Sequence, residues 1–142
     1  MKELRVEASV KKLPIVFRFV LEELENCGCS KKTMRAIKLS VEEVFVNIAQ
    51  YAYDPQTGPA IISMEVVRDP DPVRVIISFA DTGKPFDPLV VERPDTSLPL
   101  EQREAGGLGV FLVRTHMDWV HYDYQDGMNI LTIEKNLQEV AR

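Results

Sequence analysis

Two polar side chains on one predicted helix have the types and spacing to do chemistry together. Glu43 and Asn47 are four residues apart, so on a helix they lie roughly 40° apart around the axis and point the same way. A carboxylate can orient or deprotonate a hydroxyl, and an amide oxygen can ligate Mg²⁺. Ala36 and Ser40 share this face and are small, which leaves room beside it. A solvated helix face would show the same pattern, so the pair needs supporting signals.

A second candidate group directly follows an apolar strand, in Asp81-Thr82-Gly83. A carboxylate at a strand end can accept a hydrogen bond from the exocyclic amine of a purine, and a purine without the amine would leave that carboxylate unpaired. Gly83 lets a flat ligand approach the backbone closely. An ordinary Asp-x-Gly turn is the alternative interpretation.

A third candidate is the glycine cluster Gly106-Gly107-Leu108-Gly109, which opens an apolar helix. Free amides and the helix dipole bind phosphate at such a terminus, and a flexible hinge is the alternative. The sequence has no GxxxxGK[ST] loop, which excludes a P-loop protein. It also lacks a GxGxxG after its first strand, which counts against a dinucleotide-binding fold.

The elements that position these groups follow from hydrophobic periodicity. Alternation over residues 3–9 predicts a half-buried strand, and apolar residues at helical spacing predict a helix from Leu13 that ends near Gly28. Ser30 can cap a second helix, which carries Glu43 and Asn47 and should stop before Asp54-Pro55. This helix therefore presents the first candidate pair.

The rest of the chain predicts a sheet interrupted by one long segment. Strands are expected at about 60–67, 73–80, 119–124 and 129–135, with a short helix at about 109–117. The segment from 81 to 109 is rich in Pro and Gly and is predicted to be a long loop. Loops of this length are uncommon inside compact domains and are usually functional. The order of these elements predicts one sheet with its helices packed on a single face.

Composition sets the class of protein. With 142 residues, 45% of them hydrophobic and 27% charged, the chain is expected to form one globular domain over residues 1–142. No secretory h-region and no apolar run near the ~20 residues of a membrane span is present, so no membrane partner is expected. Cys27 and Cys29 form no disulfide framework, which predicts reduced thiols and a cytoplasmic location. A net charge of −5 disfavours nucleic acid as a partner.

The three candidate groups gain specificity from their order. Glu43-x-x-x-Asn47, Asp81-x-Gly83 and Gly106-Gly107-x-Gly109 together resemble the three boxes of the GHKL ATPase superfamily (gyrase, Hsp90, histidine kinase, MutL). The runs EEVFVNIAQYAY, DTGKPFDP, GGLGVFLV and MDWVHY are similar to the anti-sigma factor serine/threonine kinases of bacterial partner-switching systems. The resemblance covers about residues 1–136 and implies the Bergerat, or histidine-kinase-like ATPase, fold. The class of that fold is α/β (α+β): a two-layer sandwich of a mixed, mostly antiparallel sheet with its helices on one face.

The resemblance also implies roles for residues in an ATP site. Glu43 would be the general base for the attacking hydroxyl, and Asn47 would ligate the Mg²⁺ that bridges the triphosphate oxygens. Asp81 would receive the adenine amine, and Gly83 would line the floor under the base. Thr132, on the last strand, would be an adenine neighbour.

The phosphate end of the site is implied in the same way. Residues of about 88–105 would form an ATP lid, expected to be mobile without nucleotide. Gly107, Leu108 and Gly109 would contact the nucleotide, the two glycines giving their amides to the phosphates. Arg103 could supply a cation to the γ-phosphate.

Three positions depart from the patterns of relatives. Tyr51 stands where many relatives have a histidine, Pro85 where histidine kinases often have a glycine, and Ala105 where some relatives place a basic residue. The anti-sigma kinases tolerate the change at position 85.

The function implied is an ATP-dependent serine/threonine kinase and anti-sigma factor. It would phosphorylate a STAS-type anti-sigma antagonist, hold a sigma factor or similar regulator, and form a homodimer. One alternative is a non-catalytic ATP-binding module that sequesters a regulatory protein. Another is a stand-alone ATP hydrolase in which water replaces the serine hydroxyl.

The remaining conspicuous residues have structural interpretations. His116 and His121 have no partners at zinc-site spacing, so they are not expected to bind metal. His121 fits an outward position on a strand. Trp119 is expected in the core.

Overall fold

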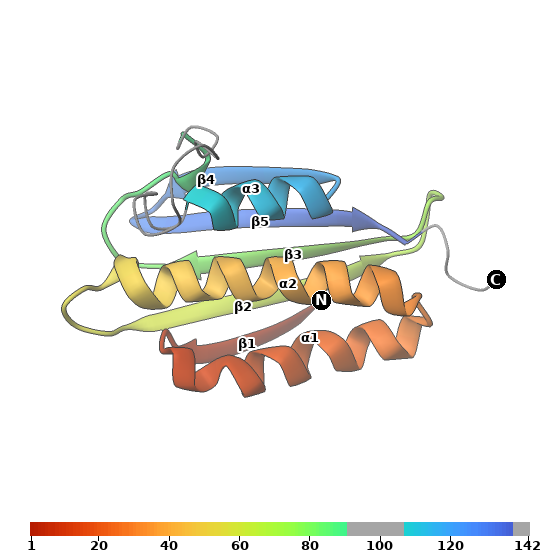
Figure 1. Cartoon of the computed structure of the whole chain (residues 1–142), viewed down its shortest axis with the longest axis horizontal. Coiled ribbons are helices and arrows are strands. Elements are labelled where there is room, and N and C mark those ends of the chain that lie inside the picture. Colours follow the sequence, from red (N-terminus) through yellow and green to blue (C-terminus); the bar gives the residue numbers. More distant parts are fainter. Residues whose placement is uncertain (91–106, 138–142) are drawn as a thin grey trace.

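A five-stranded sheet and three helices make up the computed structural model, which describes residues 1–90 and 107–137. The sheet order is β1-β2-β3-β5-β4, and all four neighbouring pairs are antiparallel. The expected fold class is confirmed, except that the sheet is antiparallel in every described pair rather than mixed. The strands are β1 Lys2–Glu7, β2 Pro59–Val67, β3 Arg74–Asp81, β4 Trp119–Gln125 and β5 Met128–Asn136 (Figure 1).

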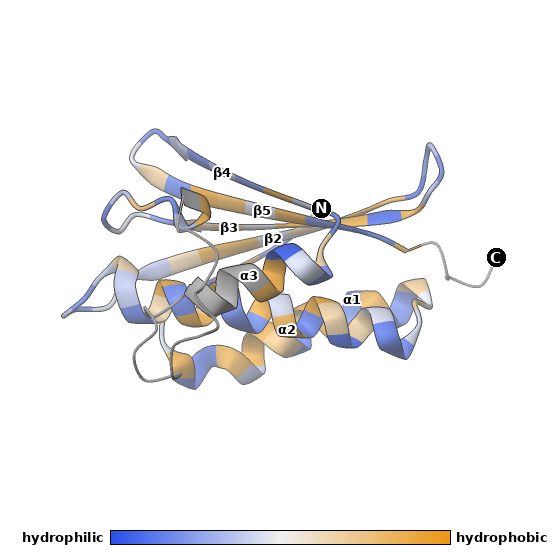
Figure 2. Ribbon diagram, turned by 45° about the horizontal axis from the view of Figure 1, so that its top comes forward, coloured by the Kyte–Doolittle hydropathy of each residue, from blue (hydrophilic) through white to orange (hydrophobic). Residues whose placement is uncertain are grey.

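The helices cover one face of this sheet (Figure 2). The long helices are α1 Leu13–Cys27 and α2 Lys31–Asn47, and α3 Gly107–His116 packs against α2. Short turns of helix are η1 Val10–Lys12, η2 Ile48–Ala52 and η3 Pro88–Val90. Within the described part of the chain, no helix combines the length and apolarity that crossing a membrane requires.

Local chemistry explains where the two long helices begin and end. Pro14 lies in the first turn of α1, and Gly28 ends that helix with φ of 76°. The Ser30 side chain accepts a hydrogen bond from the Thr33 amide at 3.1 Å and so caps α2. Directly after Asn47 the backbone widens into one π-helical turn, η2, before the chain leaves the helix at Tyr53.

The core lies between the helices and the sheet. Its largest side chains are at most 1% exposed, and they come from both layers: Leu24 and Phe45 from the helices, Met64 and Phe79 from the strands. This burial holds α2 against β3, which brings the first two candidate groups into the same region.

Trp119 is not in the core, so the expectation for it is wrong. Its side chain is 48% exposed and stacks on His121, with ring centroids 5.2 Å apart and planes at 12°. Both rings lie on the face of edge strand β4 opposite to Val120 and Tyr122, which line the helix side. The outward position expected for His121 is confirmed.

Candidate functional site

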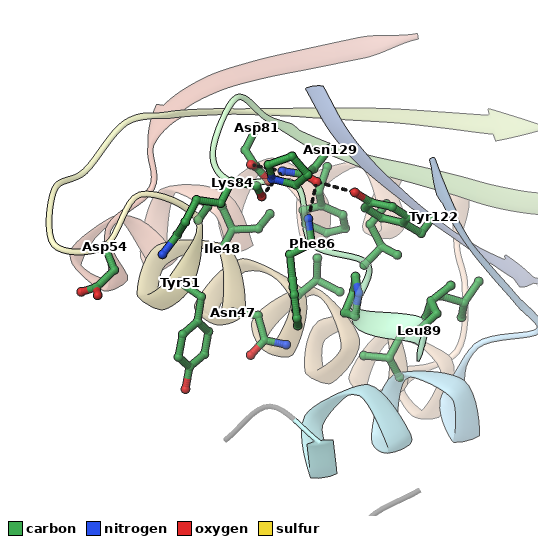
Figure 3. A pocket seen from close by; sticks show the side chains of 18 residues that line it. Asn47, Ile48, Tyr51, Asp54, Asp81, Lys84, Phe86, Leu89, Tyr122 and Asn129 are labelled. Carbon is green, nitrogen blue, oxygen red and sulfur yellow. Dashed lines mark hydrogen bonds between the residues drawn. The ribbon is translucent and has the colours of Figure 1, made fainter. Parts of the chain in front are cut away.

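A cavity of about 390 Å³ lies where the end of α2 meets the end of β3 (Figure 3). Its walls come from α2, η2, the loop after β3, α3, and strands β3, β4 and β5. The lining residues are Val44, Asn47, Ile48, Tyr51, Ala52, Asp54, Phe79, Asp81, Lys84, Pro85, Phe86, Pro88, Leu89, Val113, Val120, Tyr122, Asn129 and Leu131. Most of this wall is apolar, and a few polar groups converge on one end, as in small-molecule sites.

Asp81 is a buried carboxylate with one oxygen held and one left open. The residue is 6% exposed and is the last of β3. Its Oδ1 accepts a hydrogen bond from the Gly83 amide at 2.9 Å and another from Asn129 Nδ2 at 3.0 Å. Among the described residues no donor lies on Oδ2. This oxygen can therefore accept a hydrogen bond from a ligand.

Gly83 is glycine because the backbone passes very close to η2. A Cβ at this position would overlap the carbonyl oxygen of Ala52 and lie 2.7 Å from the Cβ of the same residue. That carbonyl oxygen also accepts a hydrogen bond from the Lys84 amide at 3.0 Å, so the loop is seated on η2 there. A larger residue would push the loop away from the end of the cavity that Asp81 occupies.

Sequence reasoning missed Asn129, which lies beside Asp81 in the strand register. Its side chain is buried, and Nδ2 also donates to the Lys84 carbonyl at 2.9 Å. The missed signal is a polar residue at a helix-facing position of β5, in line with Leu131 and Ile133 on the same strand face.

Tyr122 and Phe86 complete the polar end of the cavity. The Tyr122 hydroxyl and the Phe86 amide both donate to Asn129 Oδ1, at 2.5 Å and 3.1 Å. Burial is the largest cause that raises the pKa of Tyr122, and the charges of Asp87 and Asp81 raise it further. The phenol therefore keeps its proton at neutral pH and remains a donor.

Asn47 lines the cavity, and Glu43 precedes it by one turn on the same side of α2. Glu43 is half-buried but is not one of the described residues that line the cavity. Burial, and secondarily the neighbouring Glu42, raise the pKa of its carboxyl. A carboxylate with a raised pKa is a stronger base than an ordinary one. Of the two small residues on this face, Ser40 is fully buried and Ala36 is half-buried.

The polar side chains around the cavity suit a metal ion that is coordinated mainly by a bound small molecule and water, with few ligands from the protein. The described residues contain no cluster of three or more His, Cys, Asp or Glu side chains that could hold a metal ion. Mg²⁺ at nucleotide sites takes most of its ligands from phosphate oxygens and water, with one or two from the protein. The Asn47 amide oxygen fits that pattern, whereas His121 is stacked on Trp119 outside the cavity.

Three residues of the glycine cluster, Gly107, Leu108 and Gly109, form the start of α3. Farther along α3, Val113 lines the cavity, and Arg114 donates to the Leu89 carbonyl at 2.8 Å. Of the expected lid over 88–105, only η3 is described. Residues 91–106, which include Arg103, Ala105 and Gly106, lie outside the described residues.

Thr132 is not brought to the cavity. Its hydroxyl lies 3.0 Å from that of Ser78, its partner across β3 and β5. Adjacent residues of a strand point to opposite faces, and the neighbours Leu131 and Ile133 face the helices. The strand position next to Asp81 is that of Asn129, three residues earlier.

Most of the chain is similar to ATPase domains of known families. The model of the histidine kinase-like ATPase domain matches residues 6–135. Two relatives, both named serine-protein kinase RsbW, come from Bacillus cereus and Bacillus thuringiensis subsp. konkukian. Each is 27% identical over 133 residues, which is 91% of this chain and 81% of the relative.

Solved structures show the same fold. A crystal structure of the RsbU and RsbW domains of a Mycobacterium tuberculosis protein matches with a TM-score of 0.65 at 16% identity. It covers 96% of this chain, which spans only 33% of that one. The histidine kinase AdeS of Acinetobacter baumannii gives a TM-score of 0.53 at 16% identity, over 96% of this chain and 69% of that chain. Because the family model covers most of its length, this chain belongs to the histidine kinase-like ATPase domain family, as a distant relative of the RsbW serine-protein kinases.

Proposed function

We propose that this chain is an ATP-dependent protein serine/threonine kinase and anti-sigma factor of a bacterial partner-switching system. The observation that carries the proposal is that one cavity is lined by both a buried carboxylate, Asp81, and the amide of Asn47. The matched ATPase domain supplies the class of nucleotide. The relatives named serine-protein kinase supply the class of reaction.

Asp81 is suited to bind the base of ATP. Oδ2 would accept a hydrogen bond from the exocyclic amine of adenine, because Oδ1 is already held by two protein donors. Ile48, Phe79 and Leu131 offer apolar surface to a flat ring. A cavity of about 390 Å³ is within the size range of small-molecule sites.

The triphosphate would extend from this end toward Asn47 and the start of α3. Asn47 would hold Mg²⁺ through its amide oxygen, and the metal, when bound, neutralises negative charge on the phosphate oxygens. The backbone amides of Gly107, Leu108 and Gly109 would donate to the phosphates at the positive end of the α3 dipole. Residues 88–105 would close over the nucleotide as a lid.

Glu43 would act on the hydroxyl of the protein substrate. The serine or threonine oxygen forms a bond to the γ-phosphorus as the bond from that phosphorus to the β–γ bridging oxygen breaks, which leaves ADP. The hydroxyl proton passes to the Glu43 carboxylate. Four residues of helix place Glu43 about 6 Å along the axis from Asn47, and its raised pKa strengthens it as a base.

The protein substrate would be a STAS-type anti-sigma antagonist. A phosphate adds about −1.5 to −2 units of charge and can break an interface. Phosphorylation would then free this chain to hold a sigma factor. In this proposal residues 1–142 act as one domain, and two copies form a homodimer.

The test measures transfer of labelled phosphate from ATP to a STAS-domain partner isolated by pull-down with this chain. The Glu43→Gln variant should lose at least about 100-fold in transfer rate and still bind ATP. Glu42→Gln, its neighbour on α2, is the matched control and should keep most of the activity. Equal transfer by wild type and Glu43→Gln would contradict the role of Glu43.

A second candidate is the non-catalytic module that binds ATP and sequesters a partner. It is favoured by one observation, namely that Glu43 is outside the described lining of the cavity. This candidate predicts nucleotide-dependent capture of the partner with no labelled product from wild type. The same transfer assay therefore separates the two functions.

A further inference from the structure

Asn129 connects three parts of the polar end of the cavity through one buried amide. The residue is 7% exposed and stands opposite Asp81 in the β3–β5 register. Nδ2 donates to Asp81 Oδ1 at 3.0 Å, to the Lys84 carbonyl at 2.9 Å and, more weakly, to the Gly83 carbonyl at 3.4 Å. Figure 3 shows this amide between the strand ends and the loop after β3.

The orientation of the amide is dictated by its partners. Oδ1 faces the Phe86 amide and the Tyr122 hydroxyl, at 3.1 Å and 2.5 Å. A backbone N–H can only donate and a backbone carbonyl can only accept. Exchanging Oδ1 and Nδ2 would place donor against donor at Phe86 and acceptor against acceptor at Lys84. The amide therefore has one orientation in the folded chain.

This arrangement determines which oxygen of Asp81 is offered to a ligand. The Gly83 amide and Asn129 Nδ2 both bind Oδ1. The carboxylate cannot rotate without losing both bonds, and an unmade bond to a buried charged group is costly. Oδ2 is thus a fixed acceptor.

We propose that Asn129 is a positioning residue that sets the base preference of the cavity by holding Asp81. The inference rests on the proposed binding of ATP with its base at Asp81. Adenine carries an amine donor at position 6, whereas hypoxanthine carries a carbonyl oxygen there. A fixed carboxylate acceptor favours the amine and repels the carbonyl oxygen. A carboxylate free to turn toward water would distinguish the two bases less well.

The experiment compares the affinities of ATP and inosine triphosphate by calorimetry. Wild type should prefer ATP, and Asn129→Ala should lose about tenfold of that preference. Asp81→Asn is the reference variant that should abolish the preference. Asn136→Ala, the same change on the same strand but away from the cavity, should keep the wild-type ratio.

The outcomes distinguish the inference from the proposed function. Wild type without a preference for ATP overturns the proposed role of Asp81, and the inference with it. If Asp81→Asn loses the preference while Asn129→Ala retains the wild-type ratio, only the inference is overturned.

A second variant serves if Asn129→Ala does not fold. Asn129→Asp keeps the shape of the side chain but replaces the Nδ2 donor with a carboxylate oxygen facing Asp81 Oδ1. Two adjacent carboxylates share a proton more readily as the pH falls. The ratio of ATP to inosine triphosphate affinity should therefore rise with falling pH in this variant, relative to wild type. A ratio equal to that of wild type at every pH would overturn the inference.

Discussion

The carboxyl group of Glu43 is less stable in its charged form in the folded chain than in the unfolded chain. Burial and Glu42 raise its pKa above the ordinary value of 4.5. Ionisation of Glu43 therefore opposes folding at pH values above the folded pKa, and this cost vanishes below the unfolded value. A group with this property on the same helix face as Asn47 is typical of a functional position.

We predict that Glu43→Gln is more stable than wild type at neutral pH. Glutamine carries no charge, so it removes the cost of ionising a half-buried carboxyl. The difference should shrink as the pH falls through the raised pKa toward 4.5. Thermal unfolding of both proteins between pH 7.5 and 4 measures it. If Glu43→Gln were less stable than wild type at neutral pH, the raised pKa of Glu43 would be contradicted.

Gly83 offers a second prediction for a single residue. In Gly83→Ala the new methyl group overlaps the Ala52 carbonyl oxygen, so the loop must move away from η2. We expect a loss of about 1–3 kcal/mol in the free energy of unfolding, together with weaker nucleotide binding. Urea denaturation and calorimetry measure the two effects.

Gly28→Ala is the control for Gly83. Its Cβ would meet nothing within 4 Å, but φ of 76° is unfavourable for alanine. It should cost about 1–2 kcal/mol of stability and leave nucleotide affinity at the wild-type level. Equal effects of both variants on affinity would mean that Gly83 matters only for folding.

At the scale of elements, α2 carries both Glu43 and Asn47, so its start matters to the site. Ser30→Ala removes the acceptor of the Thr33 amide. The expected loss is about 1 kcal/mol in the free energy of unfolding, measured by urea denaturation, with unchanged nucleotide affinity in the folded protein. Ser63→Ala, a hydroxyl lost from the middle of β2, should stay within about 0.5 kcal/mol of wild type.

Trp119, on the edge strand β4, should contribute little to stability, although a large aromatic side chain is usually expected to contribute much. Trp119 is half exposed and makes one aromatic stack, so Trp119→Ala should cost at most about 1.5 kcal/mol. Phe45→Ala, at a residue that is 0% exposed, should cost about 3–5 kcal/mol. Chemical denaturation of both variants compares the two sites directly.

Strands and helices were predictable where the signal is local. Periodicity, the Ser30 cap and the Gly28 terminus predicted α1 and α2, because each depends on residues within a few positions. The face of β5 was not predictable in this way. Ile130 and Ile133 are both apolar but lie on opposite faces, and an error of one residue exchanges the faces. Thr132 was expected near the base because the family resemblance implied it, and Asn129 was missed because local pattern does not determine which face of β5 it lies on.

For the whole molecule, a ligand in the cavity would connect α2 with β3 and β5. Ligand binding to the folded state alone stabilises a protein by about 2.7 kcal/mol at 100 times the dissociation constant. ATP with Mg²⁺ should therefore raise the melting temperature of wild type. In Asn47→Ala, ATP should raise the melting temperature by less than in wild type, and by the same amount with and without Mg²⁺. Retention of the full Mg²⁺-dependent shift by this variant would contradict the role of Asn47.

The bond between Asp81 and Asn129 joins residues 48 positions apart. Bringing such distant segments together has a loop-closure entropy cost, and pairings of this kind form slowly compared with neighbouring helices. In refolding, α1 and α2 can associate before β5 reaches β3. A chain at that stage would have its long helices but would lack the hydrogen bond from Asn129 that holds the Asp81 carboxylate. Stopped-flow refolding should then show recovery of nucleotide binding in the slowest phase, which ties activity to completion of the sheet.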